Sequence, residues 1–383
     1  MSLDFLTAVD ETTLGVTALL PKQVMGKQIA VHTASEGFPD LKDIRIALIG
    51  VNESRNSYYP VETYDLSAFR REFYQLFPGN WSVGVADLGD LPPGETVDDT
   101  YHALKTICLN LRQINVIPIV IGGSQDLSIA LYQSFVELNQ WVNMVAVDNR
   151  FDFSQEEELI SGRSYMSKII MDSPNRLHNY TNIGYQSFLI AQEELDLMDK
   201  LFFDALRLGE VLDDVRQTEP IFRESDLVSF DMKALHAVAA GTFPISGMPN
   251  GMDGRTLCAL ARYAGISDRL SVMGCFELVN SPLFHKLLAQ MIWYFIEGVS
   301  RRFDEYPVAT SQGFTKYVVQ MSDRDLVFYR SEKSQRWWME LLREDYLDNK
   351  KKKSTLLSCT QADYDAACQD ILPDRWWRAS KRS

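Results

Sequence analysis

Short, nearly continuous hydrophobic runs alternate along this chain with longer segments of amphipathic, helix-length pattern. The runs that we predict as strands are 44–51, 81–86, 116–121, 142–147, 227–230 and 270–276. The segments that we predict as helices are 96–112, 127–138, 192–208, 254–264 and 282–303. Continuous hydrophobic runs are typical of strands buried on both faces, so the pattern predicts an α/β protein with a mostly parallel sheet.

Local signals refine two of these helices and one turn. Thr96 and Asp253 each precede a predicted helix and carry an oxygen that can accept a backbone N–H of the first turn. Gly122 and Gly123 follow a predicted strand, where glycine permits the backbone of a strand-to-helix turn.

Composition and charge exclude several classes of partner. The chain has 383 residues, 38 lysines and arginines, 52 aspartates and glutamates, and a net charge of -14. This balance disfavours binding to nucleic acid or to an anionic membrane surface. The longest apolar stretch, 287–296, is too short to span a bilayer. We therefore expect neither a nucleic-acid nor a membrane partner.

Cysteine usage and the N-terminal sequence indicate the compartment. The five cysteines are odd in number, lie far apart and form no CxxC pair, which favours reduced thiols. The first residues contain no basic region followed by a long apolar run, so they do not resemble a secretory signal. Both features predict a cytoplasmic protein.

Three segments at predicted strand ends concentrate the polar chemistry: IGGSQD (121–126), VDNRFD (147–152) and SFDMK (229–233). Sites in open α/β sheets form outside the carboxyl ends of the strands. In an extended strand end, alternate residues point to the same side. We therefore expect the guanidinium of Arg150 to project between Asp148 and Asp152.

These segments resemble the motifs of the ureohydrolase superfamily, which includes arginase, agmatinase and formimidoylglutamase. The family motifs read GGDHS, DAHxD and SxDxDxxDP and supply two histidines and four aspartates to a manganese pair. A fourth segment, GCFELVNSP (274–282), resembles the family's late strand with an E-x-N-P element, whose glutamate falls on Glu277. The chain looks closest to arginase-like proteins of Bacteroidetes-type bacteria, often labelled formimidoylglutamase. The resemblance covers residues 44–302 and implies a three-layer α-β-α arginase-like fold.

The resemblance also implies a domain organisation. Residues 1–40 form an N-terminal extension, 41–305 the ureohydrolase-like domain, and 306–383 a C-terminal extension packing on the same domain. The tail contains two RWW triplets, 336–338 and 375–377, expected to anchor it to the body of the fold or to a neighbouring subunit. The lysine run 350–353 is expected to be an exposed loop.

Carrying the metal ligands over one by one leaves half of them. Three aspartates match ligand positions, and three substitutions fall on the others: the matches are Asp148, Asp152 and Asp231, and the substitutions are Gln125, Arg150 and Lys233. Neither a guanidinium nor an ammonium can coordinate a metal ion. The two cations facing three carboxylates instead predict an internal salt-bridge cluster.

A rescued site with a single metal stays open as an alternative. Asp126 lies one residue beyond Gln125, and His236 and Glu277 could reach inward. Apart from such a site or a pair at low occupancy, we expect no cofactor. Glu277 is also the substrate-pocket candidate, because the resemblance implies that it grips a guanidinium group.

Two functions follow from these residues. The first is an arginase-like protein that has lost binuclear manganese hydrolysis and acts as a binding, regulatory or scaffolding subunit, without a confident catalytic residue. The second is an active C–N hydrolase acting on a guanidino or formimino substrate. In either case the resemblance implies a homo-oligomer. A small guanidino or amidine-like ligand, or a protein partner, remains open.

Overall fold

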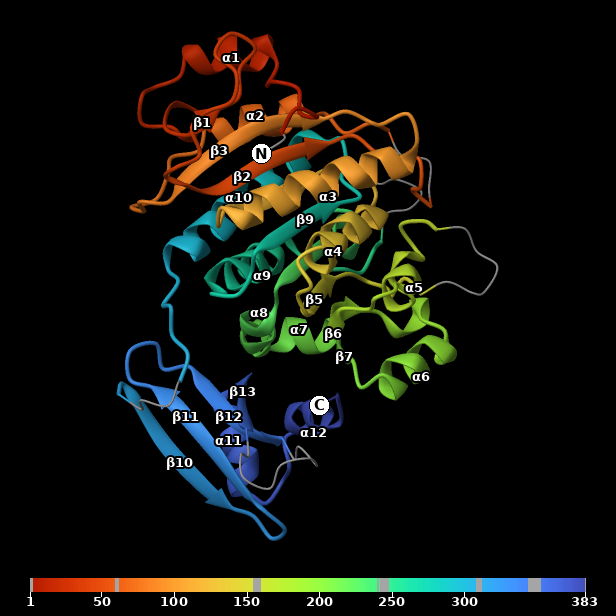
Figure 1. Ribbon diagram of the computed structural model, residues 1–383, viewed down its shortest axis with the longest axis vertical. Helices are drawn as coiled ribbons and strands as arrows, with labels where there is room; N and C mark the ends of the chain where they lie inside the picture. The colour runs from red at the N-terminus through yellow and green to blue at the C-terminus, as the bar shows by residue number, and fades with distance from the viewer. Residues whose placement is uncertain are drawn as a thin grey trace.

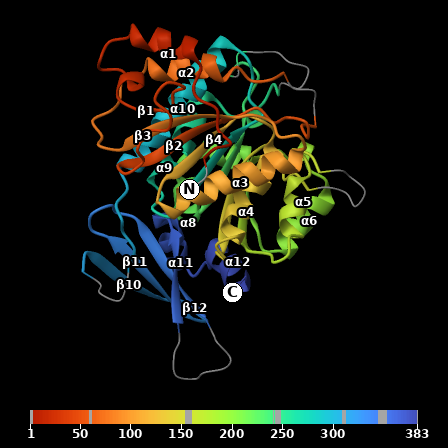
Figure 2. The same ribbon diagram turned by 45° about the horizontal axis from the view of Figure 1, so that its top comes forward.

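The computed structural model describes residues 3–58, 62–153, 160–239, 241, 248–307, 312–343 and 353–382. Within these ranges the chain forms a nine-stranded sheet and a separate four-stranded sheet. The N-terminal segment and the four-stranded sheet lie at opposite ends of the long axis (Figure 1). The same arrangement is visible after the 45° turn of Figure 2.

The nine-stranded main sheet has the order β1-β3-β2-β4-β9-β8-β5-β6-β7. Its strands are β1 (Ala30–Val31), β2 (Ile44–Val51), β3 (Gly84–Leu91), β4 (Ile117–Ile121), β5 (Val142–Val147), β6 (Leu177–Tyr185), β7 (Asp204–Arg207), β8 (Leu227–Asp231) and β9 (Val272–Phe276). Each neighbouring pair in this sheet runs parallel. The predicted α/β class with a mostly parallel sheet is confirmed.

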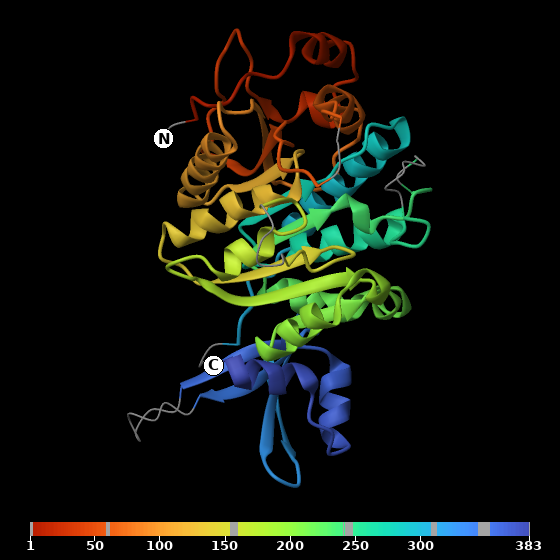
Figure 3. The ribbon, with the colours of Figure 1, turned by 90° about the vertical axis from the view of Figure 1, so that its right-hand side faces the viewer.

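Helices cover both faces of the main sheet. They are α2 (Leu66–Tyr74), α3 (Val97–Gln113), α4 (Ser128–Val136), α5 (Tyr165–Ile170), α6 (Gln192–Lys200), α7 (Leu208–Asp213), α8 (Glu219–Glu224), α9 (Gly254–Ile266) and α10 (Pro282–Ser300). The first helix, α1 (Glu11–Ala18), packs on α2. One hydrophobic cluster joins the sheet to α2, α8, α9 and α10, and a second joins it to α3, α4 and α5. Figure 3 shows the sheet between these two helical layers.

The cap and strand predictions hold where the local pattern is strong. Thr96 and Asp253 cap α3 and α9 by accepting the backbone N–H of Asp99 and Thr256. The prediction of a single helix over 192–208 is wrong in its second half. There α6 ends at Lys200, Phe202 takes a positive φ of 55°, and β7 follows.

The first forty residues pack along one edge of the main sheet. β1 pairs with β3, and Thr7 forms a bridge with Asp90 at the end of the same strand. The ring of His32 contributes a nitrogen within 3.0 Å of the Leu88 carbonyl. The segment predicted as an N-terminal extension therefore supplies β1, one of the two edge strands of the main sheet.

The C-terminal unit, Phe314–Arg382, forms the second sheet and two helices. Its elements are β10 (Phe314–Gln320), β11 (Asp325–Ser331), β12 (Trp337–Arg343), β13 (Lys353–Cys359), α11 (Gln361–Cys368) and α12 (Asp374–Arg382). The antiparallel strands and α11 enclose a small core of their own. Lysines 350–352 of the predicted exposed run lie outside the described residues.

Aromatic side chains join the C-terminal unit to the main sheet. The guanidinium of Arg223, on α8, lies over the ring of Trp338 at 4.6 Å from its centroid. The rings of Trp377 and Phe202 meet edge to face at 5.6 Å. Both RWW triplets thus contain a tryptophan that contacts the body of the fold, as predicted.

Glycine at 122 is required by the backbone after β4. Its φ is +105°, and a Cβ there would lie 2.3 Å from the Val51 carbonyl oxygen. We expect Gly122→Ala to lower the free energy of unfolding by about 2 kcal/mol or more, measured by urea denaturation. Gly15→Ala is the matched control, because a Cβ at that position in α1 meets nothing within 4 Å. A helical glycine replaced by alanine should stabilise by about 0.5–1 kcal/mol. Equal effects of the two substitutions would contradict this explanation.

Candidate functional site

The four central strands of the main sheet carry the sequence motifs to one edge. In sheet order they are β4, β9, β8 and β5, so their parallel carboxyl ends are neighbours. The polar residues that end or follow these strands are buried: Gln125, Asp148, Asp152, Asp231 and Glu277. The structure therefore brings the predicted candidates together at the edge where α/β proteins place their sites.

Gln125 is held by two neighbouring residues. Its backbone N–H donates to Glu277 Oε1 at 3.2 Å, and its side-chain Nε2 donates to the hydroxyl of Tyr165 at 3.2 Å. Its Oε1 is buried and accepts no hydrogen bond from a described residue. Only this neutral oxygen remains for a ligand.

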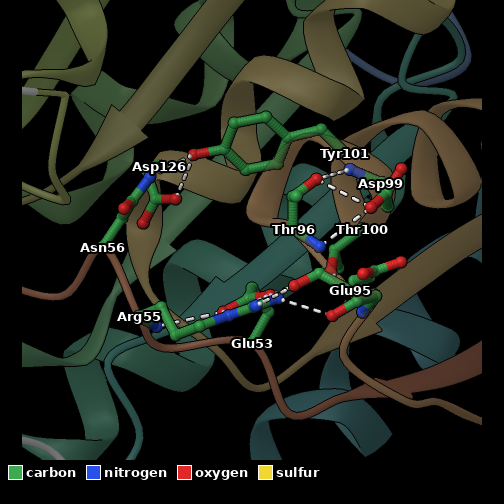
Figure 4. Close-up of polar contacts among 10 residues, drawn as sticks. Glu53, Arg55, Asn56, Glu95, Thr96, Asp99, Thr100, Tyr101 and Asp126 are labelled. Atoms are coloured by element: carbon green, nitrogen blue, oxygen red, sulfur yellow. Dashed lines mark hydrogen bonds and ion pairs between the residues drawn. The ribbon is translucent and has the colours of Figure 1, made fainter.

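Asp126, the first alternative metal ligand, is engaged on the other side of its turn. The hydroxyl of Tyr101, on α3, donates to Asp126 Oδ2, and Asn56 Nδ2 donates to the same hydroxyl at 3.1 Å (Figure 4). Burial raises the pKa of Asp126. Tyr101 therefore holds one oxygen of the carboxyl group that the alternative single-metal site would use.

A second polar network fixes the loop after β2 beside this tyrosine. Glu53, which is buried, accepts from Arg55 Nη2 at 2.5 Å and from Thr100 Oγ1 at 2.8 Å. Arg55 Nη1 also donates to the Glu95 carbonyl at 2.9 Å (Figure 4). The loop and the beginning of α3 are thereby tied together at the wall of the candidate site.

Asp148 and Asp152 lie close enough for their carboxyl groups to share a hydrogen bond. Burial raises the pKa of both, and the charge of Asp148 raises that of Asp152 further. Two carboxylates this close cannot both ionise without strong repulsion. Sharing one proton between the two carboxyl groups would remove this repulsion.

Arg150 does not enter this pair, so the prediction that it projects between Asp148 and Asp152 is wrong. Its Nη1 donates to the Leu189 carbonyl at 2.6 Å, and it forms no ion pair with either aspartate. The alternation fails because β5 ends at Val147 and Asp152 has a φ of +56°. Arg150 contributes its backbone N–H to Asp148 Oδ1 at 3.0 Å. Only its main chain touches the cluster.

Lys233 supplies one of the two cations of the predicted cluster, and its ion-pair partner is Glu277. Its Nζ lies 2.5 Å from Glu277 Oε2, and the side chains are 21% and 2% exposed. Its backbone N–H donates to Asp231 Oδ1 at 2.7 Å. The ammonium group of Lys233 is therefore paired with the carboxylate of Glu277, the residue that the resemblance implied would bind a guanidinium group.

The charges of the cluster influence one another through this lysine. Burial alone would lower the pKa of Lys233, but Asp231 and Glu277 more than offset it and raise the pKa. Burial and the charge of Asp148 raise the pKa of Asp231, and Lys233 opposes them. Lys233 thus stays protonated, and its charge lowers the free energy needed to ionise the buried carboxyl groups of Asp231 and Asp152.

His236, the second alternative ligand, belongs to a turn. Its Nδ1 accepts the backbone N–H of Ala239 at 2.9 Å. The backbone N–H of His236 donates to the Met252 carbonyl, and this bond connects the turn to the loop before α9. Its ring therefore stabilises the local loop.

The donor set does not fit a manganese pair. Within the residues that the structure describes, no group of three or more histidine, cysteine, aspartate and glutamate side chains is arranged to hold a metal ion. Manganese pairs need several anionic or imidazole donors to offset the repulsion between the ions. Here Lys233 stands beside the carboxylates as a fixed positive charge.

Sequence reasoning missed several residues that shape this site. Tyr165 contacts Gln125 from α5, a helix that was not predicted. Ser57 Oγ lies 3.4 Å from Glu277 Oε2, and a Cβ on Gly162 would lie 2.8 Å from Glu277 Oε1. None of these residues belongs to a recognisable motif, so the chain folding back over Glu277 could not be read from the pattern.

Comparisons with known proteins give a fold and no closer relative. No protein-family model matches the chain, and a search of curated proteins found no similar sequence. Among the described residues, no helix is long and apolar enough to cross a bilayer.

Solved structures of arginase-like proteins are similar to most of the chain. The formimidoylglutamase from Bacillus subtilis has a TM-score of 0.63 and 15% identity over 76% of this chain and 100% of that one. The formiminoglutamase with Mn2+2 from Trypanosoma cruzi has a TM-score of 0.59 and 16% identity, covering 69% and 96%. The agmatine ureohydrolase of Thermoplasma volcanium has a TM-score of 0.57 and 16% identity, covering 75% and 97%. The chain therefore has the arginase-like fold that its sequence motifs predicted.

Proposed function

We propose that this arginase-like protein has lost binuclear manganese hydrolysis and acts as a binding, regulatory or scaffolding subunit. The observation that carries the proposal is the ion pair between Lys233 and Glu277, at 2.5 Å and largely buried. An ammonium beside Asp231 repels divalent cations and neutralises the glutamate that would receive a cationic substrate. A metal pair would have to displace this cation before binding.

Loss of the metal would remove the nucleophile. Hydrolysis of a guanidinium or formimino carbon at neutral pH requires a strong nucleophile, and metal coordination supplies one by lowering the pKa of bound water to about 7. Bulk water, with a pKa of about 15.7, is a poor substitute. The buried histidine-free cluster of Asp148, Asp152 and Asp231 contains no other group that we can assign to that role.

The alternative is an active C–N hydrolase on a guanidino or formimino substrate. It is favoured by three buried oxygens that accept no hydrogen bond from a described residue: Gln125 Oε1, Asp148 Oδ2 and Asp152 Oδ2. Unsatisfied buried acceptors are costly, and a bound cation would satisfy them. A single metal at low occupancy belongs to this alternative.

Metal content and product release distinguish the two functions. We expect protein purified in the presence of manganese to contain far less than one ion per chain, measured by mass spectrometry. We also expect it to release neither urea from arginine or agmatine nor formamide from formimidoylglutamate. Stoichiometric manganese with turnover abolished by Asp231→Ala would overturn the proposal and establish the alternative.

A restoring variant tests the reason for the loss. Gln125→His, Arg150→His and Lys233→Asp together replace the three substituted ligand positions. We expect manganese binding to return in this triple variant. Lys233→Met alone is its control, since it removes the cation without adding a donor. If Lys233→Met bound as much manganese as the triple variant, the ammonium alone would be what excludes the ions. If the triple variant bound none, the ligand assignments would be wrong.

The remaining parts of the proposal concern the assembly and its surroundings. We propose a homo-oligomer in the cytoplasm, with a small guanidino or amidine-like molecule or a protein as partner. The reduced state of the described cysteines supports the compartment: Cys108, Cys258, Cys275, Cys359 and Cys368 form no disulfide. Light scattering coupled to size-exclusion chromatography tests the oligomeric state directly.

A further inference from the structure

A cavity of about 150 Å³ lies between the C-terminal unit and the main sheet, and residues of both line it. Its walls come from the beginnings of β5 and β6, from α8, from β12 and β13, and from α12. Because its lining includes residues at the amino ends of the parallel strands β5 and β6, it lies at the end of the sheet opposite Asp148 and Asp231, which end or follow β5 and β8. It is therefore separate from the candidate site described above.

The cavity continues into a larger groove. This groove measures about 770 Å³ and runs between β7, α7 and the two C-terminal helices. Asp204, Ile221 and Arg375 line both spaces. A cavity of about 150 Å³ holds a molecule the size of benzene. With the groove beside it, there is room for a ligand of roughly ten non-hydrogen atoms.

Direct contacts between the two units fix the walls of the cavity. Arg223 Nη2 donates to the carbonyls of Trp337 and Cys359, each at 3.1 Å. Glu224 Oε1 accepts the backbone N–H of Ser358 at 2.9 Å. Arg378 Nη1 donates to the Phe203 carbonyl at 3.0 Å. The space between these contacts is thus held open by a defined interface.

Among the arginines that line these two spaces, Arg375 is the one without an ion pair to a carboxylate of a described residue. Four other arginines line the two spaces and pair with acidic residues: Arg216 with Asp214, Arg269 with Asp226, Arg378 with Asp199 and Asp374, and Arg382 with Asp204. Within the described part of the chain, Arg375 makes one hydrogen bond, from Nη1 to the Ser358 carbonyl at 3.3 Å. The rest of its planar guanidinium is available for a carboxylate in bidentate geometry.

Two asparagines of the main sheet provide acceptors in the same cavity. Asn143 Nδ2 donates a hydrogen bond to the Glu224 carbonyl at 2.8 Å, and Asn179 Nδ2 donates one to Asp204 Oδ2 at 3.2 Å. Because their donor ends are engaged, their side-chain oxygens remain. These oxygens are buried and accept no hydrogen bond from a described residue. Such acceptors favour a ligand that donates N–H groups.

We propose that this cavity binds a free α-amino acid with an uncharged side chain. Its carboxylate would pair with the guanidinium of Arg375, and its ammonium would donate to the oxygens of Asn143 and Asn179. A ligand held between α12 and the strands of the main sheet would also strengthen the contact between the C-terminal unit and the rest of the fold.

Calorimetry on the full-length protein tests the proposal. Each L-amino acid with an uncharged side chain is titrated separately, and binding of at least one is expected. For the one that binds best, the corresponding amide, which lacks the carboxylate, should bind at least about tenfold more weakly. The corresponding acid without the amine should weaken likewise. Inorganic phosphate should not compete.

Two variants and one control assign the contacts. Arg375→Ala should weaken binding by about tenfold or more, and Arg375→Lys should retain part of it, because lysine keeps the charge without the planar fork. Asn179→Leu should weaken binding of the amino acid while leaving the affinity of the amine-free acid unchanged. Arg301→Ala is the control, since Arg301 lines neither space, is 62% exposed and pairs with Glu297. It should bind like the wild type.

The proposal fails on any of several results. These are the absence of binding by every amino acid tested, equal affinity in the wild type and Arg375→Ala, and phosphate binding as tight as that of the best amino acid. The melting temperature of each variant without ligand shows whether it is folded. If Arg375→Ala does not fold, Asn179→Leu and the amide comparison still decide the question.

Discussion

Lys233→Met should lower the free energy of unfolding by about 3 kcal/mol near pH 8, the cost of leaving a buried carboxylate without its cation. The methionine has a similar length and no charge, so packing is largely kept. Glu277 loses its partner at 2.5 Å although its side chain is only 2% exposed. Asp231 and Asp152 lose the positive charge that lowers their pKa values. Urea denaturation of both proteins measures the difference.

The deficit of Lys233→Met should shrink as the pH falls. In the wild type, burial and neighbouring carboxylates raise the pKa values of Asp152 and Asp231, and Lys233 opposes this. Without Lys233 the folded state takes up protons at a higher pH. A folded state that binds more protons than the unfolded state loses stability as the pH rises above the unfolded aspartate pKa of about 3.9. The difference between the two proteins should therefore be larger near about pH 8 than near about pH 5.

The raised pKa of Lys233 itself does not contribute within that window. Stability from a lysine with a raised pKa is fully present below its unfolded pKa of about 10.4 and is lost only as the pH rises through the folded value. The dependence between about pH 5 and about pH 8 thus reports on the carboxyl groups. A deficit independent of pH would mean that methionine disturbs packing instead of charge.

Lys105→Met provides the matched control. Lys105 also has a side chain that is 21% exposed, but its partner Glu137 is 55% exposed at 3.3 Å. Exposed pairs contribute about 0–1 kcal/mol, so this variant should remain close to the wild type. The double variant Lys233→Met with Glu277→Gln should recover part of the lost stability, because it removes the unpaired charge. A double variant as unstable as the single one would argue against the ion pair.

Most of the main sheet could be predicted because its strands are buried on both faces. The runs 44–51 and 142–147 coincide with β2 and β5. The capping oxygens of Thr96 and Asp253 also locate the beginnings of α3 and α9. In these places the local pattern and the tertiary environment favour the same structure, which is why sequence reasoning succeeds.

The prediction failed where a distant partner changes the environment of a polar residue. The strand predicted at 81–86 is β3, Gly84–Leu91, whose second half contains the charged residues Asp87 and Asp90. A charged residue normally marks the end of a buried strand. Here Arg70 on α2 neutralises both aspartates, and its position is visible only in the fold.

The C-terminal strands escaped prediction for a related reason. Buried and exposed residues do not alternate regularly in β10, where Val319 is buried and Thr315, Lys316 and Val318 are exposed. A clean alternation is the usual sequence signal of an antiparallel sheet with one face in solvent, and β10 lacks it. In the candidate site, too, one feature could be predicted from the sequence and another could not. The nearness of its motifs followed from strand order, but the direction of Arg150 depended on where β5 ends.

Arg70→Met should be among the most damaging substitutions in the main domain, lowering the free energy of unfolding by about 3–5 kcal/mol. Arg70 is 2% exposed and Asp87 is fully buried. Its guanidinium donates to Asp87 from Nε at 2.9 Å and to Asp90 from Nη2 at 2.7 Å. Asp87 also accepts from the hydroxyl of Tyr74 at 2.9 Å and from the backbone of Gly89 at 3.0 Å. Removing the arginine leaves two carboxylates together at low exposure with only neutral donors.

The neighbouring residue on α2 supplies the control for this substitution. Arg71 lies 3.6 Å from Asp65, and the two side chains are 39% and 52% exposed. Arg71→Met should change the free energy of unfolding by about 0.5 kcal/mol or less. Both variants alter the charge and the helix propensity of α2 in the same way, so the difference between them isolates the buried contacts. The slope of the urea transition should stay unchanged in each, because the surface exposed on unfolding is the same. If Arg70→Met and Arg71→Met were equally stable, the Asp87 and Asp90 contacts would contribute nothing, and β3 would owe its length to its neighbours β1 and β2 alone.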